Sequence, residues 1–202
     1  MKIHPNFAML GAVVPVLAWS AWNPFDRLTW WLETAPIFFA FAALFIAQFH
    51  GWKFSGWVSF WIAIHMILLA VGGHYTYARV PLGDWIEQCL DLQRNPYDRI
   101  GHFLQGMVPA MVCREIMIRL RVIAHRGWLG FCVVSVALAI SASYELLEWA
   151  AAMISAEAAA SFLGTQGDNW DTQWDMFLAL CGALFTVFAT RRLHDAVLRK
   201  MS

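Results

Sequence analysis

The stretch GWVSFWIAIHMILLAVGG, residues 56–73, decides the fold class of this chain. It contains no Asp, Glu, Lys or Arg, and its only ionisable side chain is His65. An α-helix of this length is about 27 Å long, close to the roughly 30 Å thickness of the hydrocarbon core of a bilayer. The stretch therefore predicts a transmembrane helix.

Five further apolar stretches flank this one. The amino-terminal stretch is expected to be a membrane helix rather than a signal peptide, because the indoles of Trp19 and Trp22 surround any cleavage site. None of the stretches alternates as barrel strands do. The sequence therefore predicts an all-α polytopic bundle of about six transmembrane helices, a single integral membrane domain over residues 1–202, with helices at 7–21, 32–49, 56–73, 100–118, 128–153 and 175–190.

Composition and charge exclude several classes of protein. Hydrophobic residues make up 60% of the chain and charged residues only 14%, which is far more apolar than a typical soluble domain. The formal net charge of zero gives no reason to expect a nucleic-acid partner. The four cysteines show no CxxC spacing, so neither a cysteine metal site nor a disulfide framework is expected.

The distribution of Lys and Arg predicts the orientation in the membrane. If the amino terminus is cytoplasmic, ten of the fourteen cationic residues lie on the cytoplasmic side, as the positive-inside rule requires. Both termini are then cytoplasmic, and the two long connections, 74–97 and 155–174, are external. Within the first of these, residues 84–93 form a short amphipathic segment suited to the membrane surface.

Three polar clusters lie at the outer ends of the predicted helices. Asp98 and His102 are four residues apart, Glu145 and Glu148 are three apart, and Asp171 and Asp175 are again four apart, so each pair shares one helix face. The topology brings all three clusters to one depth, which predicts a single site. The candidate metal ligands are Asp98, His102, Glu145, Glu148, Asp168, Asp171, Asp175 and His74.

Crowded carboxylates near hydrocarbon are unfavourable unless some are protonated or a cation is bound. Oxygen ligands suit Mg, Ca or Mn, and an imidazole ligand also admits Zn, so the sequence favours a divalent cation as cofactor. Other interpretations stay open. Acids at the start of a helix are favoured by its dipole, Glu148 is suited to a solvated interface, and His65 suits a packing role deeper in the membrane.

Three motifs resemble those of VanZ-like membrane proteins: Asp98-Arg99-Ile100-Gly101-His102-Phe103, Tyr144-Glu145-Leu146-Leu147-Glu148, and the segment 171–182. The chain departs from that pattern in having Glu148 where Gln is usual and Ala179 where Asn is usual. The block GDNWDTQWDM, residues 167–176, is similar to one in the YjdF-like inner membrane proteins. This resemblance implies a bacterial inner membrane protein with Asp98, His102, Glu145, Asp171 and Asp175 at the matching polar positions.

Three classes of function fit these observations. The first is a membrane-embedded enzyme in which His102, Glu145, Asp171 and Asp175 are catalytic, acting with a divalent cation on a lipid-linked or cell-envelope substrate. Membrane lipids are the expected partners. No motif of a covalent nucleophile occurs, so activated water is the more economical route. The alternatives are a proton- or cation-coupled transporter of small molecules, and a structural or regulatory membrane protein without catalysis.

Overall fold

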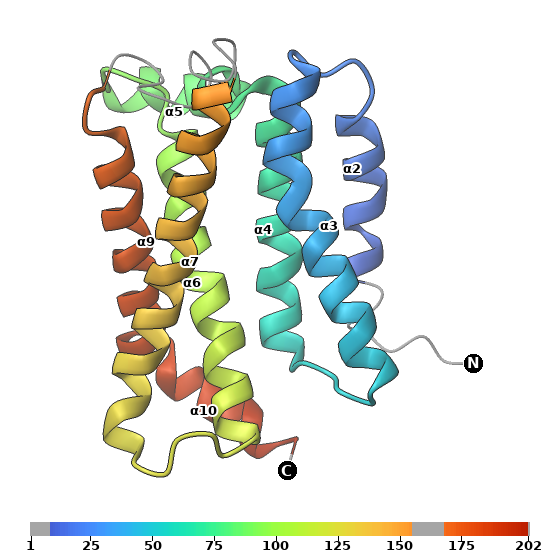
Figure 1. Cartoon of the computed structure of the whole chain (residues 1–202), viewed down its shortest axis with the longest axis vertical. Coiled ribbons are helices and arrows are strands. Elements are labelled where there is room, and N and C mark those ends of the chain that lie inside the picture. The colour runs from blue at the N-terminus through green and yellow to red at the C-terminus, as the bar shows by residue number, and fades with distance from the viewer. Residues whose placement is uncertain (1–8, 155–167, 202) are drawn as a thin grey trace. The chain divides into compact units, whose positions relative to one another are not determined.

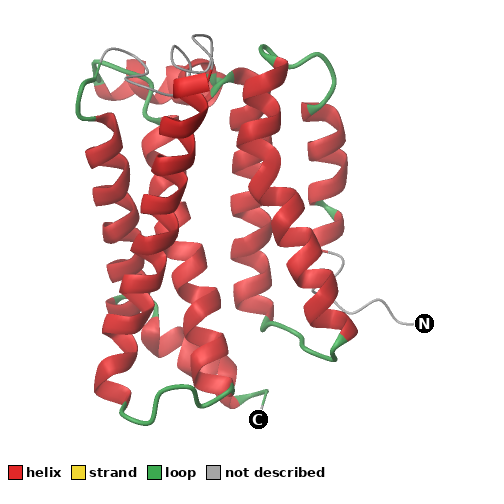
Figure 2. Ribbon diagram, viewed as in Figure 1, coloured by secondary structure: helices red, strands yellow, loops and turns green. Residues whose placement is uncertain are grey.

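The computed structural model describes residues 9–154 and 168–201. Within these residues every regular element is a helix, which confirms the predicted all-α membrane bundle (Figure 2). The predicted outer connection 155–174 lies mostly outside the described residues. By their contacts the helices form two compact units, Met1–Asp98 and Arg99–Ser202. The single domain over residues 1–202 stays a prediction.

The first unit is built on helix α4 (Gly56–Tyr75), which packs against both α2 (Val13–Ser20) and α3 (Arg27–Phe49). Capping side chains set where two of these helices begin. Asp26 accepts a hydrogen bond from Thr29 N at 2.7 Å, and Ser55 accepts one from Val58 N at 3.3 Å. Each satisfies one of the backbone donors that a helix start leaves open.

Two short helices follow α4 in the first unit, the 3-10 turn η1 (Tyr77–Arg79) and α5 (Pro81–Leu90). The structure confirms the predicted amphipathic helix but starts it three residues earlier. Pro81 stands at the first helical position, where its fixed φ favours a helix and its missing N–H costs nothing. Leu82, Trp85 and Leu90 are exposed on it.

The second unit contains α7 (Arg126–Ile154), α9 (Asp171–Phe188), α10 (Arg191–Arg199) and all but the first two residues of α6 (Tyr97–Arg119). Helices α6 and α9 run in the same direction and α7 in the opposite one (Figure 1). Their core is formed by Ala110, Val133, Ala137 and Ala183. We call the end where α6 and α9 begin the acidic end, and the end where they finish the basic end.

Two glycines let α6 and α9 touch backbone to backbone. A Cβ on Gly106 would lie 2.5 Å from the carbonyl carbon of Ala179, and a Cβ on Gly182 would lie 2.8 Å from Met107 N. Thr186 Oγ1 adds a buried hydrogen bond of 2.9 Å to the carbonyl oxygen of Met107. Small residues and cross-helix hydroxyl bonds are typical of helix pairs in membranes.

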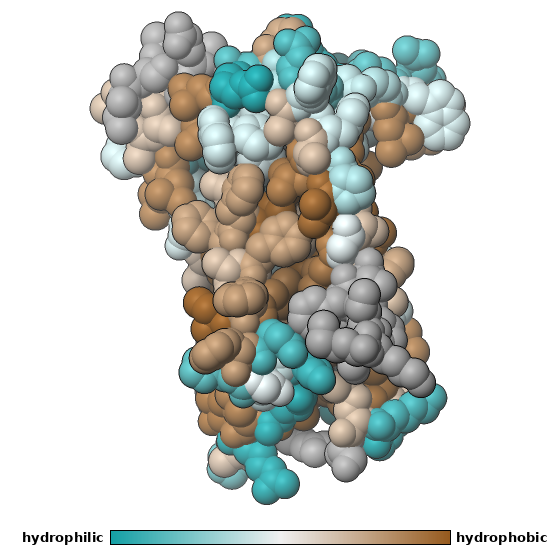
Figure 3. All heavy atoms as spheres, turned by 90° about the vertical axis from the view of Figure 1, so that its right-hand side faces the viewer, coloured by the Kyte–Doolittle hydropathy of each residue, from teal (hydrophilic) through white to brown (hydrophobic). Residues whose placement is uncertain are grey.

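Among the described residues, three helices are long and apolar enough to cross a bilayer, namely Arg27–Phe49, Gly56–Tyr75 and Gly127–Met153. A fourth is added if α9 and α10, which are bent by 53° relative to each other, count as one span. The prediction of six spans is therefore not confirmed by length and composition, and it stays a prediction. On the face shown in Figure 3, apolar side chains lie between hydrophilic ones at either end, as expected for a membrane protein.

Candidate functional site

At the acidic end of the second unit, a histidine lies between two carboxylates from different helices. His102 Nδ1 on α6 is 3.8 Å from Glu145 Oε1 on α7, and His102 Nε2 is 3.6 Å from Asp175 Oδ2 on α9. The exposed fractions of the three residues are 9%, 7% and 4%. The structure thus brings together the central residues that the sequence predicted.

These separations are informative about what the site can hold. Hydrogen bonds between nitrogen and oxygen are about 2.7–3.2 Å long, so neither ring nitrogen is at hydrogen-bond distance from these oxygens. Two ligands of a tetrahedral ion with bonds of about 2.1 Å lie about 3.4 Å apart, close to the 3.6 Å between His102 and Asp175. The spacing therefore suits an ion between the two side chains.

Asp98 lies one helical turn before His102 on the same helix, α6. A ligand atom of His102 lies within 4.8 Å of one from Asp98 and within the same distance of one from Asp175. Among the described residues, these three form the group of acidic and imidazole side chains with metal-ligand spacing. The predicted assignment of Asp98 and His102 to one face is thus supported.

The start of α9 explains how its two aspartates reach the site. The apolar stretch predicted for this helix begins at Asp175, and the pairing of Asp171 with Asp175 on one face required a start near Asp171, which is where the structure begins it. Asp171 and Asp175 are therefore four residues apart within one helix, and both are buried. One turn further along, Ala179 meets Gly106, which is one turn beyond His102, so this close contact holds His102 against Asp175.

The electrostatics of this cluster require a counter-charge. His102, Glu145, Asp171 and Asp175 are all at least nine-tenths buried. Taking an ion out of water costs several kcal/mol even after relaxation, and like charges in one place add to that cost. The dipole at the start of α9 favours Asp171, but it falls off within the first turn. Protons or a bound cation must therefore neutralise part of the carboxylate charge.

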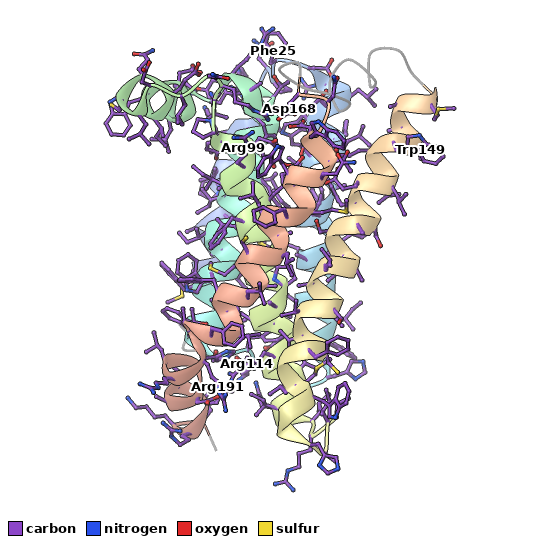
Figure 4. The ribbon with its side chains drawn as sticks, turned by 90° about the vertical axis from the view of Figure 1, so that its left-hand side faces the viewer. Phe25, Arg99, Arg114, Trp149, Asp168 and Arg191 are labelled. Atoms are coloured by element: carbon purple, nitrogen blue, oxygen red, sulfur yellow. The ribbon has the colours of Figure 1, made fainter. Side chains whose placement is uncertain are left out.

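Asp168 lies at the edge of this cluster. Its Oδ2 is 3.4 Å from Arg99 Nη2, and its Oδ1 accepts a hydrogen bond of 2.9 Å from Trp170 N. The guanidinium of Arg99 also stacks over the ring of Trp174, 5.6 Å from its centre. Figure 4 shows Arg99 and Asp168 together at this end. These contacts account for the position of Asp168 at the start of α9 without a metal ion. Ligation by Asp168 stays a prediction.

The remaining candidate ligands, Glu148 and His74, are not among the three side chains with metal-ligand spacing. Glu148 is half-buried, one turn beyond Glu145 on α7. His74 belongs to the first unit, where Nδ1 is 3.0 Å from the carbonyl oxygen of Ser20 and the ring stacks on Trp19. His65 is half-buried on the same helix, α4. Metal binding by Glu148 and His74 stays a prediction.

Sequence reasoning missed two residues that lie one helical turn from residues of this site. Ser141 lies one turn before Glu145 on α7, is fully buried, and its Oγ has no hydrogen-bond partner among the described residues. The i,i+4 spacing to Glu145 was its only signal in the sequence. Gly106 lies one turn after His102, and a glycine inside a predicted helix is a recognisable sign of close packing.

Comparison with known proteins agrees with this membrane architecture. Residues 5–196 match the family model described as "Predicted membrane protein (DUF2238)". The chain is 46% identical to "Inner membrane protein YjdF" of Escherichia coli (strain K12) over 185 residues, which are 92% of this chain and 88% of that relative. No solved structure matches the chain. The relation to VanZ-like proteins stays a prediction.

An inner membrane relative and apolar helices of spanning length support a membrane location for this protein. The family match covers nearly the whole chain, including α6, α7, α9 and most of α10 in the second unit. The chain therefore belongs to the DUF2238 family of membrane proteins, which includes YjdF-like inner membrane proteins.

Proposed function

We propose that the acidic end of the second unit binds a divalent cation and acts on a lipid-linked or cell-envelope substrate. The observation that carries this proposal is the buried His102, whose two ring nitrogens face carboxylates from two other helices at 3.6 and 3.8 Å. Burying such a cluster at membrane depth costs free energy, so its presence points to a function that requires it.

The geometry distinguishes the roles of the two carboxylates. An imidazole can place one nitrogen on a metal while the other donates its N–H to a carboxylate, which fixes the ring orientation. The Nε2 atom and Asp175, with Asp98 one turn away, are the better ligand group. Glu145, 3.8 Å from Nδ1, is in this proposal the residue that would draw close enough to orient the ring when the ion is bound, and that would accept a proton from an attacking water.

The surroundings of the site favour a substrate that arrives within the membrane. Trp149, Trp170 and Trp174 are exposed at the acidic end, and indoles gather where hydrocarbon meets headgroups. The positive-inside rule places the opposite, arginine-rich end in the cytoplasm, so the site faces outward. A bound divalent cation would polarise a phosphoryl or carbonyl oxygen of a lipid-linked substrate at that level.

Elemental analysis of the purified full-length protein tests the metal site. We expect about one divalent ion per chain in the wild type. His102→Gln and Asp175→Asn should each lose this ion, because each removes a side chain that binds it directly. Glu145→Gln should retain the ion with affinity lowered about 10–100-fold, since it removes only the group that orients the ring. Asp91→Asn, at an exposed carboxylate that directly follows α5, is the matched control.

The same preparations separate this proposal from the alternatives. Release of phosphate or carboxylate from lipid-linked esters by wild type, but not by Asp175→Asn, would support the enzyme. If folded wild type contains no metal and gains none on incubation with Mg, Ca, Mn or Zn, the metal-dependent enzyme is rejected. Proton-coupled transport or a structural role would then explain the buried acids.

A further inference from the structure

The basic end of the second unit contains a cavity that the candidate metal site does not use. Its volume is about 790 Å³, within the range of small-molecule binding sites. It lies where α6 and α9 end, beside the start of α7 and along α10. Its charged lining residues are Arg114, Arg119, Arg121, Arg191, Arg199 and Asp195. His102 and Arg114 are twelve residues apart on α6, or about 18 Å, so the two sites are distinct.

The charge of this cavity is strongly positive. Five arginines face one aspartate in the lining, which leaves a formal excess of four positive charges. The excess is still three if Glu115 is included, which is fully buried behind the lining and accepts a hydrogen bond of 2.9 Å from Arg119. Clustered guanidinium groups in a partly apolar cavity attract an anion.

Arg114 shows that this cavity is built rather than a chance grouping of surface side chains. Only 4% of Arg114 is exposed, and its Nη2 donates a hydrogen bond to Asp195 Oδ1. Its Nη1 is also buried but has no hydrogen-bond partner among the described residues. A buried donor without an acceptor is unfavourable, so the site lacks an acceptor that a ligand oxygen would supply.

The arrangement around Asp195 keeps its charge away from a ligand. One oxygen accepts from Arg114, and the other is 3.9 Å from Arg191 Nε on the same helix. Asp195 therefore orients the guanidinium of Arg114 and lies close to that of Arg191. Figure 4 shows Arg114 and Arg191 near each other at this end. Met117, Leu129 and Val187 supply apolar walls beside them.

We propose that this cavity binds the phosphate group of an anionic ligand. Guanidinium groups pair with phosphate oxygens through two parallel hydrogen bonds, which makes arginine the preferred residue for phosphate recognition. The apolar walls suit the glycerol and first carbons of an anionic phospholipid, and basic pockets between membrane helices bind such headgroups. A soluble phosphate ester presents the same group, so the two sources must be separated by experiment.

The test measures ligand binding by the full-length protein in an uncharged detergent. The probes are phosphatidylglycerol in mixed micelles, with phosphatidylcholine for comparison, and glycerol 3-phosphate and inorganic phosphate in solution. The test variant is Arg121→Gln/Arg191→Gln, two exposed lining residues. The matched control is Arg192→Gln/Lys200→Gln, which removes the same charge from two exposed residues of the same end that do not line the cavity.

We expect the test variant to bind the effective probe at least about tenfold more weakly than wild type, since it removes two charge-assisted contacts. The control should change the dissociation constant much less, because the charges that it removes lie outside the cavity and their effect on the ligand is screened by solvent. A response to phosphatidylglycerol alone assigns the cavity to a lipid headgroup, whereas a response to glycerol 3-phosphate or phosphate alone assigns it to a soluble ester. Equal weakening in both variants, or binding of no probe, would overturn the proposal.

Discussion

Replacement of Gly106 by alanine should open the contact between α6 and α9 and with it the candidate metal site. The new Cβ would lie 2.5 Å from the carbonyl carbon of Ala179 and closer still to its oxygen, whereas ordinary contacts begin at 3.4 Å. The obstacle is backbone, which cannot rotate away as a side chain can. The two helices must therefore separate locally by at least about 0.9 Å, the difference between these two distances, and by more to clear the oxygen.

The consequences of this separation can be estimated at two places. The hydrogen bond from Thr186 to the carbonyl of Met107, now 2.9 Å, would lengthen to about 3.8 Å and be lost. The distance from His102 Nε2 to Asp175 Oδ2, now 3.6 Å, would become about 4.5 Å. Two metal–ligand bonds of about 2.1 Å span at most about 4.2 Å, so one ion could no longer bind both residues.

We expect Gly106→Ala to lower the free energy of unfolding by about 2–4 kcal/mol, combining overpacking with the lost cross-helix hydrogen bond. The assays are chemical unfolding in detergent and metal content of the folded fraction. Gly127→Ala is the matched control, because a Cβ there meets nothing within 4 Å. That control should be neutral or slightly stabilising, by up to about 1 kcal/mol. A Gly106→Ala protein with wild-type stability and metal content would refute this account of the contact.

Two further predictions concern the start of α3 and the orientation in the membrane. The hydrogen bond from the backbone of Thr29 holds the pKa of Asp26 below its usual range. The ionised cap therefore stabilises the protein fully at pH values above the ordinary carboxyl pKa. This stabilisation is lost as the pH falls through the lowered pKa. Asp26→Ala should lower the free energy of unfolding by about 1 kcal/mol at pH 7 and by less under strongly acidic conditions. Chemical unfolding at both pH values measures this difference, and an equal loss at both would contradict the reasoning. A reporter that is active only in the periplasm, fused after Lys200, should be inactive, and activity there would reverse the assigned orientation.

The sequence predicted the all-helical fold and the proximity of His102, Glu145 and Asp175, because both depend on local regularities. A run of apolar residues long enough to cross a bilayer specifies a helix, and the alternating direction of successive helices places His102, Glu145 and Asp175 at one end. What it could not predict was which helices touch. The contact of Gly106 with Ala179 depends on the rotation of two helices about their axes, and spacing along one helix does not specify that rotation.

The basic end shows a feature for which the sequence made no prediction, the burial of charge. Arg114 is one of the ten cationic residues that the positive-inside rule assigns to the cytoplasmic side, and that rule says nothing of its burial. In the structure it is 4% exposed, and Glu115 and His194 beside it are fully buried, 3.3 Å apart. Helix α10, which was not predicted, supplies both His194 and Asp195. Burial of charge by a partner helix has no signal in the residues that it covers.

Helix α6 unites these observations, because the sequence predicted a span at 100–118 and yet α6 is not among the described helices that are long and apolar enough to cross a bilayer. Its uncharged stretch, residues 103–113, is about 16 Å long, much shorter than the roughly 30 Å of a bilayer core. A helix that faces lipid could not carry the charged residues beyond either end of this stretch at such depth. Ala110 packs in the core with α7 and α9, and Arg114 and Glu115 pair with side chains of α10 and of α6 itself. The neighbouring helices therefore meet the apolar requirement of the membrane, and α6 carries one buried ionisable group of each proposed site, His102 and Arg114.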